Sequence, residues 1–135
     1  VTKKNPFKNK TLFSLSKRVE LSKDLAKKIK KIEIKSFDKK IKSTNTIDLI
    51  KYLKKTNKKN SFFLIIGSDN LINFHKWKEW KLLGELTKIV VFSRKNYDIK
   101  AKKSVIVKKL KKIIFIKNKQ INISSTIIRK NLSQF

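Results

Sequence analysis

One run of consecutive apolar residues constrains the fold more than any other feature of this sequence. Residues 62–66 read Phe-Phe-Leu-Ile-Ile and are followed by Gly67. A strand with one face in solvent alternates apolar and polar residues, whereas a strand buried on both faces of a parallel sheet is apolar throughout. We therefore expect residues 62–66 to form the central strand of a parallel sheet, buried on both faces.

The remaining apolar segments follow in an alternation of strands and helices. Apolar runs predict further strands over residues 88–92 and 113–116, and alternation predicts a half-buried strand over residues 32–37. Helical spacing and capping residues predict helices over 15–30, from a cap at Thr46, over 77–86 and from Thr126 to about Leu132. A polar loop is expected from Ser68, and surface connections over 56–60 and 100–112.

This alternation is typical of an α/β fold with a parallel sheet flanked by helices. Ligands of such sheets bind at the carboxyl ends of the strands, so the function is expected in residues 67–77, 94–97 and 124–129. The 135 residues are enough for one domain, which we expect to span residues 1–135. The apolar runs are too short to cross a bilayer and no signal peptide is recognisable, which favours a cytoplasmic protein without a membrane partner.

The net charge of +28 raises the question of a nucleic-acid partner. Only three of the 37 basic residues are arginine, although arginine dominates specific recognition of phosphates and bases. The lysines are also scattered along the whole chain rather than gathered in one arm. The pattern therefore favours a solvated basic surface over nucleic-acid binding. The absence of cysteine excludes disulfides, thiolate nucleophiles and cysteine-based zinc sites.

A hydroxyl-rich segment opens the last predicted helix. Ser124, Ser125 and Thr126 precede Arg129 at helical spacing, and a helix amino terminus presents free N–H groups to an anion. Phosphate binding is one interpretation of this segment. The alternative is that a serine caps the helix and the arginine lies on the surface.

Gly67 and Asp69 follow the central predicted strand directly. A glycine at this turn permits close approach of a ligand, and the carboxylate beyond it can accept hydrogen bonds from ribose hydroxyls. The alternative is that Asp69 caps a following short helix.

Two tryptophans and the only histidine lie in residues 74–80, which read Phe-His-Lys-Trp-Lys-Glu-Trp. One of Trp77 and Trp80 is expected to line a site and stack on an aromatic ligand, while the other packs into the core. His75 has no second histidine or cysteine with which to hold a metal, so we expect a loop residue without a catalytic role.

Taken together, these segments resemble bacterial nicotinate-nucleotide adenylyltransferases. The resemblance covers nearly the whole chain and rests on Phe62–Asn70, Lys76-Trp77 with Trp80, Val90–Arg94 with Tyr97, and Ile123-Ser124-Ser125-Thr126-x-x-Arg129, with Asn5–Lys8 and Thr46–Asp48 upstream. It implies a Rossmann-like nucleotidyltransferase fold. It also implies an enzyme that transfers the adenylyl group of ATP, accompanied by Mg²⁺, to nicotinate mononucleotide in NAD biosynthesis.

The resemblance also assigns roles to individual residues. Thr46, Trp77, Lys78 and Arg94 would bind the nicotinate nucleotide, and Gly67 and Asp69 would contact ribose. Ser124, Ser125, Thr126 and Arg129 would bind the ATP phosphates. The chain departs from the family at Asn45, where an aromatic residue is common, and at Lys95-Asn96, where the family commonly has Pro-Gly.

The family begins with a strand and a Gly-rich loop, Phe-Asp-Pro-x-His-x-Gly-His, whose histidines hold the triphosphate. These 135 residues do not contain that segment, so we expect an amino-terminal strand-helix unit of about 30 to 40 residues to be missing. No catalytic residue is therefore assigned, and the chain alone is expected to be nearly inactive. Two alternatives stay open: a basic nucleotide- or RNA-binding protein, and an adenylyltransferase for nicotinamide mononucleotide or phosphopantetheine. A homo-oligomer is also left open.

Overall fold

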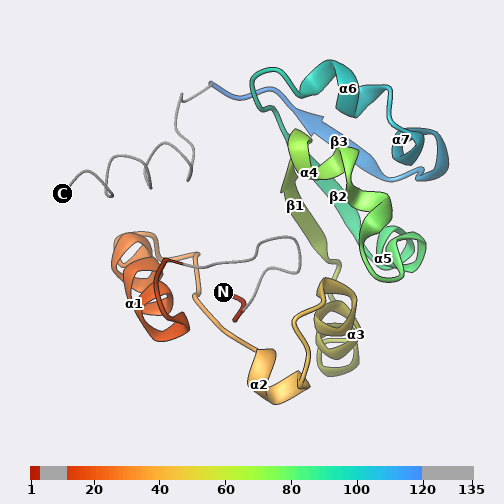
Figure 1. Cartoon of the computed structure of the whole chain (residues 1–135). Coiled ribbons are helices and arrows are strands. Elements are labelled where there is room, and N and C mark those ends of the chain that lie inside the picture. Colours follow the sequence, from red (N-terminus) through yellow and green to blue (C-terminus); the bar gives the residue numbers. More distant parts are fainter. Residues whose placement is uncertain (4–11, 120–135) are drawn as a thin grey trace. The chain divides into compact units, whose positions relative to one another are not determined.

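The computed structural model describes residues 1–3 and 12–119 (Figure 1). The elements are α1 (Leu15–Ala26), α2 (Asp38–Ile41), α3 (Thr46–Thr56), β1 (Phe63–Gly67), α4 (Ser68–Ile72), the 3₁₀ helix η1 (Phe74–Lys76), α5 (Trp80–Leu86), β2 (Lys88–Phe92), α6 (Asp98–Lys102), α7 (Val105–Lys109) and β3 (Ile113–Ile116). The closing helix predicted from Thr126 lies outside the described residues.

The chain divides into two compact units. The first comprises Val1–Phe62 and Lys76–Thr87, and the second comprises Phe63–His75 and the described residues from Lys88 on. Each unit is described by itself below. The expectation of one domain over residues 1–135 stays a prediction.

The second unit contains a parallel sheet with strand order β1-β2-β3. Phe63 pairs with Lys88 and Gly67 with Phe92, while Ile89 pairs with Ile113. Parallel neighbours require a crossover, and α6 with α7 provides the one between β2 and β3. The short helix α4 packs against β1 and β2 and contacts α6, so helices flank the sheet as expected for an α/β fold.

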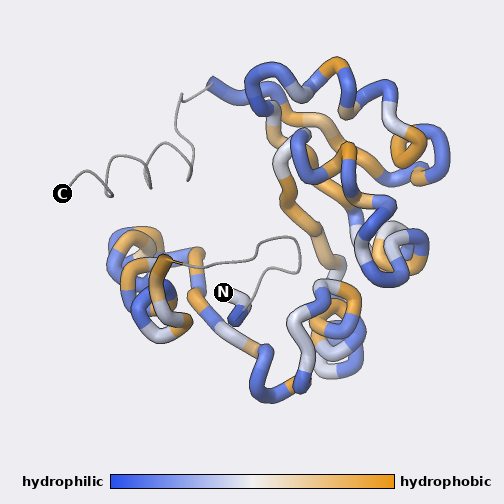
Figure 2. Tube along the Cα trace, viewed as in Figure 1, coloured by the Kyte–Doolittle hydropathy of each residue, from blue (hydrophilic) through white to orange (hydrophobic). Residues whose placement is uncertain are grey.

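The core of this unit is built on β2. Ile89, Val90 and Val91 are buried on this strand, and Leu71 and Phe74 are fully buried in the segment after β1. Figure 2 shows the hydrophobic residues that run along the strands and the hydrophilic residues that predominate in the connections. Burial of these apolar side chains is the main force that holds the sheet together.

The first unit is helical. In α1, which begins after the Ser14 cap, none of the residues is buried. In α3, Ile47 and Ile50 are buried, and α3 contacts both α2 and α5. Leu83 of α5 is fully buried, and its carbonyl accepts a hydrogen bond from the Thr87 hydroxyl at 2.7 Å. This bond satisfies a carbonyl at the end of α5.

Two expectations about the strands are wrong. β1 is the edge strand of the described sheet rather than its centre, because β2 is its one partner strand among the described residues, and Phe63 and Ile65 on β1 are exposed. Residues 32–37 form no strand; within the described residues, the backbone bond from this segment to residues 1–3 runs from the Val1 amino group to Lys35 O at 2.7 Å. This bond alone does not form the ladder of backbone hydrogen bonds that pairs two strands.

The helix predictions need corrections at their ends. α1 ends at Ala26, and α5 begins at Trp80 because Glu79 adopts a left-handed conformation that interrupts the helix. Asn45 is the N-cap of α3, so Thr46 is its first helical residue rather than its cap. Short helices also replace the predicted polar loop from Ser68 and most of the connection over 100–112.

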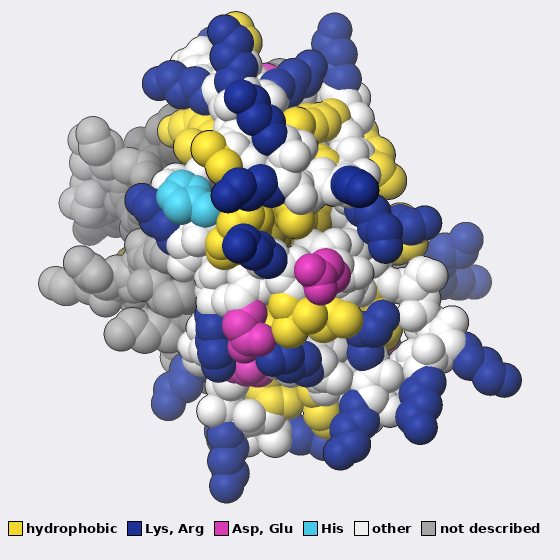
Figure 3. All heavy atoms as spheres, turned by 90° about the vertical axis from the view of Figure 1, so that its right-hand side faces the viewer, with side chains coloured by type: hydrophobic (Ala, Val, Ile, Leu, Met, Phe, Trp, Pro, Cys, Tyr) yellow, Lys and Arg dark blue, Asp and Glu magenta, His cyan; other side chains and the backbone are white. Residues whose placement is uncertain are grey.

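The basic side chains are distributed over the surface. Figure 3 shows lysine and arginine side chains over the described part of the face that it presents, interrupted by acidic and hydrophobic side chains. Among the described residues, no helix has the length and apolarity needed to span a membrane.

Candidate functional site

The structure separates the described site residues into two groups. Gly67, Asp69 and Arg94 belong to the second unit, and Thr46, Trp77 and Lys78 belong to the first. The residues expected to bind phosphate lie outside the described part of the chain. They are Ser124, Ser125, Thr126 and Arg129.

In the second unit, polar side chains meet at the carboxyl ends of β1 and β2. Gly67 ends β1 opposite Phe92, the last residue of β2, so the segments that follow both strands leave the sheet at one edge. Nη1 of Arg94 lies 3.1 Å from Oδ2 of Asp69 and forms an ion pair with it. This edge is where a parallel sheet binds its ligands.

Gly67 provides room for this ion pair. A methyl group at position 67 would overlap Oδ1 of Asp69 and lie 3.1 Å from Nε of Arg94. The φ angle of Gly67 is −84°, an ordinary value, so space rather than backbone conformation requires the glycine here.

One oxygen of Asp69 has no partner among the described residues. Oδ1 is buried without a hydrogen bond, whereas Oδ2 accepts from Arg94. A buried acceptor without a donor is unfavourable, so a ligand hydroxyl that reaches this oxygen would gain a strong hydrogen bond.

Three further residues hold Arg94 in place, and sequence reasoning missed all of them. The buried Ser68 hydroxyl and Oδ1 of Asp98 both accept from the Arg94 N–H at 3.0 Å, and Ser93 Oγ donates to Oδ2 of Asp98 at 2.6 Å. Hydrogen bonds from the Ser93 and Ser68 hydroxyls and from the Arg94 N–H lower the pKa of Asp98 below its usual value, against the effect of partial burial. Ser68 and Ser93 lie in the runs that carry the family resemblance, and Asp98 lies in the first turn of α6, a helix that the sequence did not predict.

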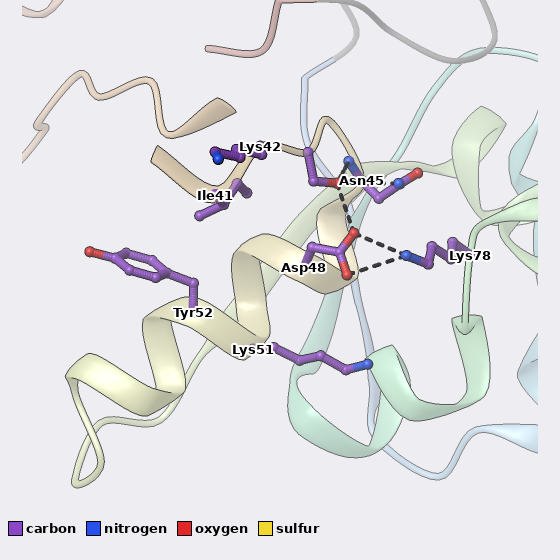
Figure 4. Close-up of a pocket in the computed structure, with 8 residues that line it drawn as sticks. Ile41, Lys42, Asn45, Asp48, Lys51, Tyr52 and Lys78 are labelled. Carbon is purple, nitrogen blue, oxygen red and sulfur yellow. Dashed lines mark hydrogen bonds and ion pairs between the residues drawn. The ribbon is translucent and has the colours of Figure 1, made fainter. Parts of the chain in front are cut away.

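In the first unit, a pocket of about 580 Å³ lies beside the amino terminus of α3 (Figure 4). Its lining residues are Ile41, Lys42, Ser43, Asn45, Asp48, Lys51, Tyr52 and Lys78. Thr46 is adjacent in sequence and half-buried at the start of α3. Three of the lining residues, Lys42, Lys51 and Lys78, are lysines, so the pocket is suited to an anionic ligand.

Asp48 is the central acidic group of this pocket. Nζ of Lys78 lies 3.1 Å from Oδ2 of Asp48, which also accepts from Ser43 Oγ at 2.7 Å (Figure 4). The Ser43 hydroxyl is the largest cause of a lowered pKa at Asp48, and Lys78 and Asn45 lower that pKa further against the effect of burial. The carboxylate is therefore ionised at neutral pH, and it fixes the side chain of Lys78.

One of the two tryptophans was expected to pack into the core, but neither is fully buried. Trp77 and Trp80 are both half-buried, and Nζ of Lys81 lies 5.8 Å from the centre of the Trp80 ring. Phe74 is the fully buried aromatic residue of residues 74–80. His75 is exposed, and within the described residues no three His, Cys, Asp or Glu side chains gather to hold a metal ion.

The parallel sheet flanked by helices, with polar side chains at the carboxyl ends of its strands, is an α/β fold of the kind that binds nucleotides, and comparison with known proteins identifies its class as a nucleotidyltransferase. The chain belongs to the cytidylyltransferase-like family, whose members it matches over residues 1–131. Nucleotidyltransferases typically use a divalent metal together with the nucleoside triphosphate.

Two similar relatives carry the same name. A protein of Pelagibacter ubique (strain HTCC1062), "Probable nicotinate-nucleotide adenylyltransferase", is 42% identical over 132 residues, which are 96% of this chain and 73% of that protein. A protein of Aquifex aeolicus (strain VF5) with this name is 32% identical over 127 residues, which are 90% of this chain and 76% of that protein.

A solved structure has the same fold. The nicotinic acid mononucleotide adenylyltransferase of Plasmodium falciparum, complexed with APC, superposes with a TM-score of 0.71 at 23% identity. The superposition covers 87% of this chain and 61% of the Plasmodium chain. A second structure of that protein, complexed with NaAD, gives a TM-score of 0.68.

Proposed function

We propose that this chain provides the nicotinate-nucleotide site of an enzyme that transfers the adenylyl group of ATP to nicotinate mononucleotide. The products are nicotinate adenine dinucleotide and pyrophosphate, and the pathway is NAD biosynthesis. The observation that carries the proposal is the 42% identity with the Pelagibacter protein over 96% of this chain. Both substrates are small metabolites, so we place the reaction in the cytoplasm.

The reaction needs no nucleophile from the protein. A phosphate oxygen of nicotinate mononucleotide forms a bond to the α-phosphorus of ATP, and the bond from that phosphorus to the bridging oxygen of pyrophosphate breaks. Catalysis of this displacement depends on positioning and on stabilisation of charge at the phosphoryl oxygens. Mg²⁺ enters with ATP, because Mg²⁺ binds substrate phosphates and retains several waters, and it would neutralise part of this charge.

The first unit would bind the pyridine ring. Trp77 offers an aromatic surface for stacking, and the Thr46 hydroxyl and the backbone N–H of Lys78 are donors for the nicotinate carboxylate. Lys42, Lys51 and Lys78 outnumber Asp48 in the lining of the pocket beside the amino terminus of α3, and this net positive charge favours the anionic acid over the neutral amide.

The residues at the carboxyl ends of β1 and β2 are assigned to ribose and phosphate groups. Oδ1 of Asp69 is an acceptor for a ribose hydroxyl, Gly67 leaves the space that the Asp69 carboxylate occupies, and Arg94 offers a cation for a phosphate. Ser124, Ser125, Thr126 and Arg129 are assigned to the ATP phosphates, with the hydroxyls and guanidinium as donors.

The test is a titration that compares two ligands on the purified chain by calorimetry. We expect nicotinate mononucleotide to bind at least about tenfold more tightly than nicotinamide mononucleotide, since one charge-assisted hydrogen bond contributes about 1.4 kcal/mol or more. Trp77→Ala should abolish this binding, whereas the matched control Trp80→Phe should retain it. Equal affinities for the two ligands, or binding that survives Trp77→Ala, would contradict the proposal.

A further inference from the structure

Two ion pairs connect α3 to the turn that follows Trp77. Asp48 pairs with Lys78 at 3.1 Å, and Lys51 pairs with Glu79 at 2.7 Å. All four residues belong to the first unit. Asp48 and Glu79 are not among the residues assigned to ligand binding above, and Lys51 enters there only as one of the cations that line the pocket.

The order of the charges specifies one register. Asp48 and Lys51 are three residues apart and share one face of α3, whereas Lys78 and Glu79 are consecutive. Exchange of the partners would place Asp48 against Glu79 and Lys51 against Lys78, two contacts between like charges. The observed alignment of the turn with α3 is therefore favoured over the exchanged one.

Asp48, the residue of α3 that pairs with Lys78, is itself held by hydrogen bonds. Oδ2 of Asp48 accepts from Ser43 Oγ at 2.7 Å, and Ser43 Oγ in turn accepts from the Asn45 N–H at 3.1 Å. The Asp48 side chain is only 23% exposed, compared with 50% for Lys78. Figure 4 shows the Asp48 carboxylate between the Asn45 segment and the Lys78 ammonium group.

The turn after Trp77 contains a backbone conformation that contacts from other residues must stabilise. Glu79 adopts φ 48° and ψ 41°, a left-handed conformation that is unfavourable for a residue with a Cβ atom. Its carboxylate lies 2.7 Å from Nζ of Lys51. The ion pair thus acts on the residue whose backbone conformation separates Trp77 and Lys78 from α5.

We propose that Asp48 and Lys51 are positioning residues that hold the Trp77–Glu79 turn against α3 before the ligand binds. The inference rests on the proposed function in one respect, namely that Trp77 and Lys78 contact the pyridine end of nicotinate mononucleotide. Each ion pair is partly exposed and weak by itself, but both restrain the same three-residue turn, so their effects combine on the orientation of Trp77.

The first test needs no ligand. In a Trp80→Phe background, Trp77 is the only tryptophan, and acrylamide quenching of its fluorescence reports how accessible the turn is. Asp48→Asn and Lys51→Met should each increase the quenching constant, and the double variant should increase it most. Glu33→Gln and Lys35→Met are matched controls, because they remove an exposed 2.8 Å ion pair elsewhere in the first unit. Unchanged quenching in the double variant would overturn the proposal.

A charge exchange separates positioning from loss of folding. Lys51→Glu alone places a like charge against Glu79 and should increase quenching, whereas Lys51→Glu combined with Glu79→Lys restores an ion pair and should reverse the increase. A general loss of structure would not be reversed by the second substitution. Absence of this rescue would contradict a positioning role for Lys51.

The second test measures ligand affinity in the same variants. Asp48→Asn should weaken nicotinate mononucleotide binding by about three- to fivefold, the effect of losing one partly exposed ion pair, and should leave ATP affinity unchanged. Increased quenching together with equal weakening of both ligands would contradict selective positioning. If the unsubstituted chain does not bind nicotinate mononucleotide, the proposed function fails, and the quenching results still decide whether the ion pairs hold the turn.

Discussion

Arg94 and Asp69 form an ion pair across the carboxyl ends of two neighbouring parallel strands, with Nη1 and Oδ2 3.1 Å apart. The Arg94 N–H is held by Ser68 and Asp98, so the start of the segment after β2 is fixed to the segment after β1. Gly67 lies beside both side chains, and its missing Cβ leaves the space that they occupy. The geometry of this edge therefore depends on a residue without a side chain.

Gly67→Ala should disturb the ion pair while the sheet stays intact. The added methyl group overlaps Oδ1 of Asp69, which must rotate away, so the free energy of unfolding should fall by about 1 kcal/mol, the lower end of the range for an added methyl group. Urea denaturation measures this change. Titration with nicotinate mononucleotide should show weaker binding, because Asp69 loses its position.

The control for this prediction is the same substitution in an Asp69→Ala background. The overlapping oxygen is then absent, so Gly67→Ala should lower the free energy of unfolding much less than it does in the unsubstituted chain. Equal costs in the two backgrounds would show that the methyl group acts on something other than Asp69.

Asp98 should make the stability of the second unit depend on acid pH. Its pKa is lowered in the folded chain, first by the Ser93 hydroxyl, so the unfolded chain binds more protons than the folded chain as the pH falls. The stabilisation is therefore complete above the unfolded pKa and disappears as the pH falls through the lower folded pKa. Free energies of unfolding measured from about pH 6 to pH 2 should decrease, and Asp98→Asn should flatten this decrease.

The Ser43 hydroxyl lowers the pKa of Asp48 in the same way. Asp48→Asn should therefore also flatten the decrease in the free energy of unfolding toward acid pH. The matched control is Asp24→Asn, since Asp24 lies on the exposed helix α1. A decrease as steep in Asp98→Asn as in the unsubstituted chain would show that Ser93 and Arg94 do not stabilise the ionised form of Asp98.

The sequence predicts the strands better than their places in the sheet. The runs over 88–92 and 113–116 coincide with β2 and β3, because short apolar runs are a local property of the chain. The position of a strand depends instead on its neighbours, and β1, with the longest apolar run, is an edge strand of the described sheet. The helices α6 and α7 are five residues each and lysine-rich, so they lack the periodicity that would reveal them.

The candidate site could be predicted only in part. The turn after β1 and the segment after β2 were recognisable because ligands bind at the ends of parallel strands. The partners of each side chain were not, since Asp48 and Lys78 are 30 residues apart and Asp69 and Arg94 are 25 apart. Only the fold brings these pairs together. The roles assigned to Ser124, Ser125, Thr126 and Arg129 stay predictions.

Two isoleucines on adjacent strands should differ strongly in their contribution to stability. Ile89 on β2 is 1% exposed and Ile65 on β1 is 66% exposed. Ile89→Ala should lower the free energy of unfolding by about 2 to 5 kcal/mol through lost burial and a residual cavity. Ile65→Ala should lower it by less than about 1 kcal/mol, mainly through the lower strand propensity of alanine.

Each isoleucine is the control for the other, because both substitutions remove the same atoms from one sheet. Chemical denaturation followed by circular dichroism measures both. A cost for Ile65→Ala as large as that for Ile89→Ala would mean that Ile65 is covered in solution, contrary to its exposure in the structure.

The net charge of +28 predicts that any association of RNA with this chain is non-specific and strongly salt-dependent. Binding to a short single-stranded RNA that neutralises about five phosphates should weaken by about 100-fold between 50 and 200 mM salt, because counterions are released. Nicotinate mononucleotide carries few charges, so its affinity should weaken by less than about tenfold over the same range. Fluorescence titrations at both salt concentrations measure the two ligands.

Sequence preference separates a basic surface from a dedicated RNA site. Lysines spread over the visible face offer contacts to phosphates but no defined set of donors and acceptors for bases, so poly(A) and poly(U) should bind alike at low salt (Figure 3). RNA binding that keeps both its strength and a base preference at 200 mM salt, in a chain that does not bind nicotinate mononucleotide, would favour an RNA-binding protein over an adenylyltransferase.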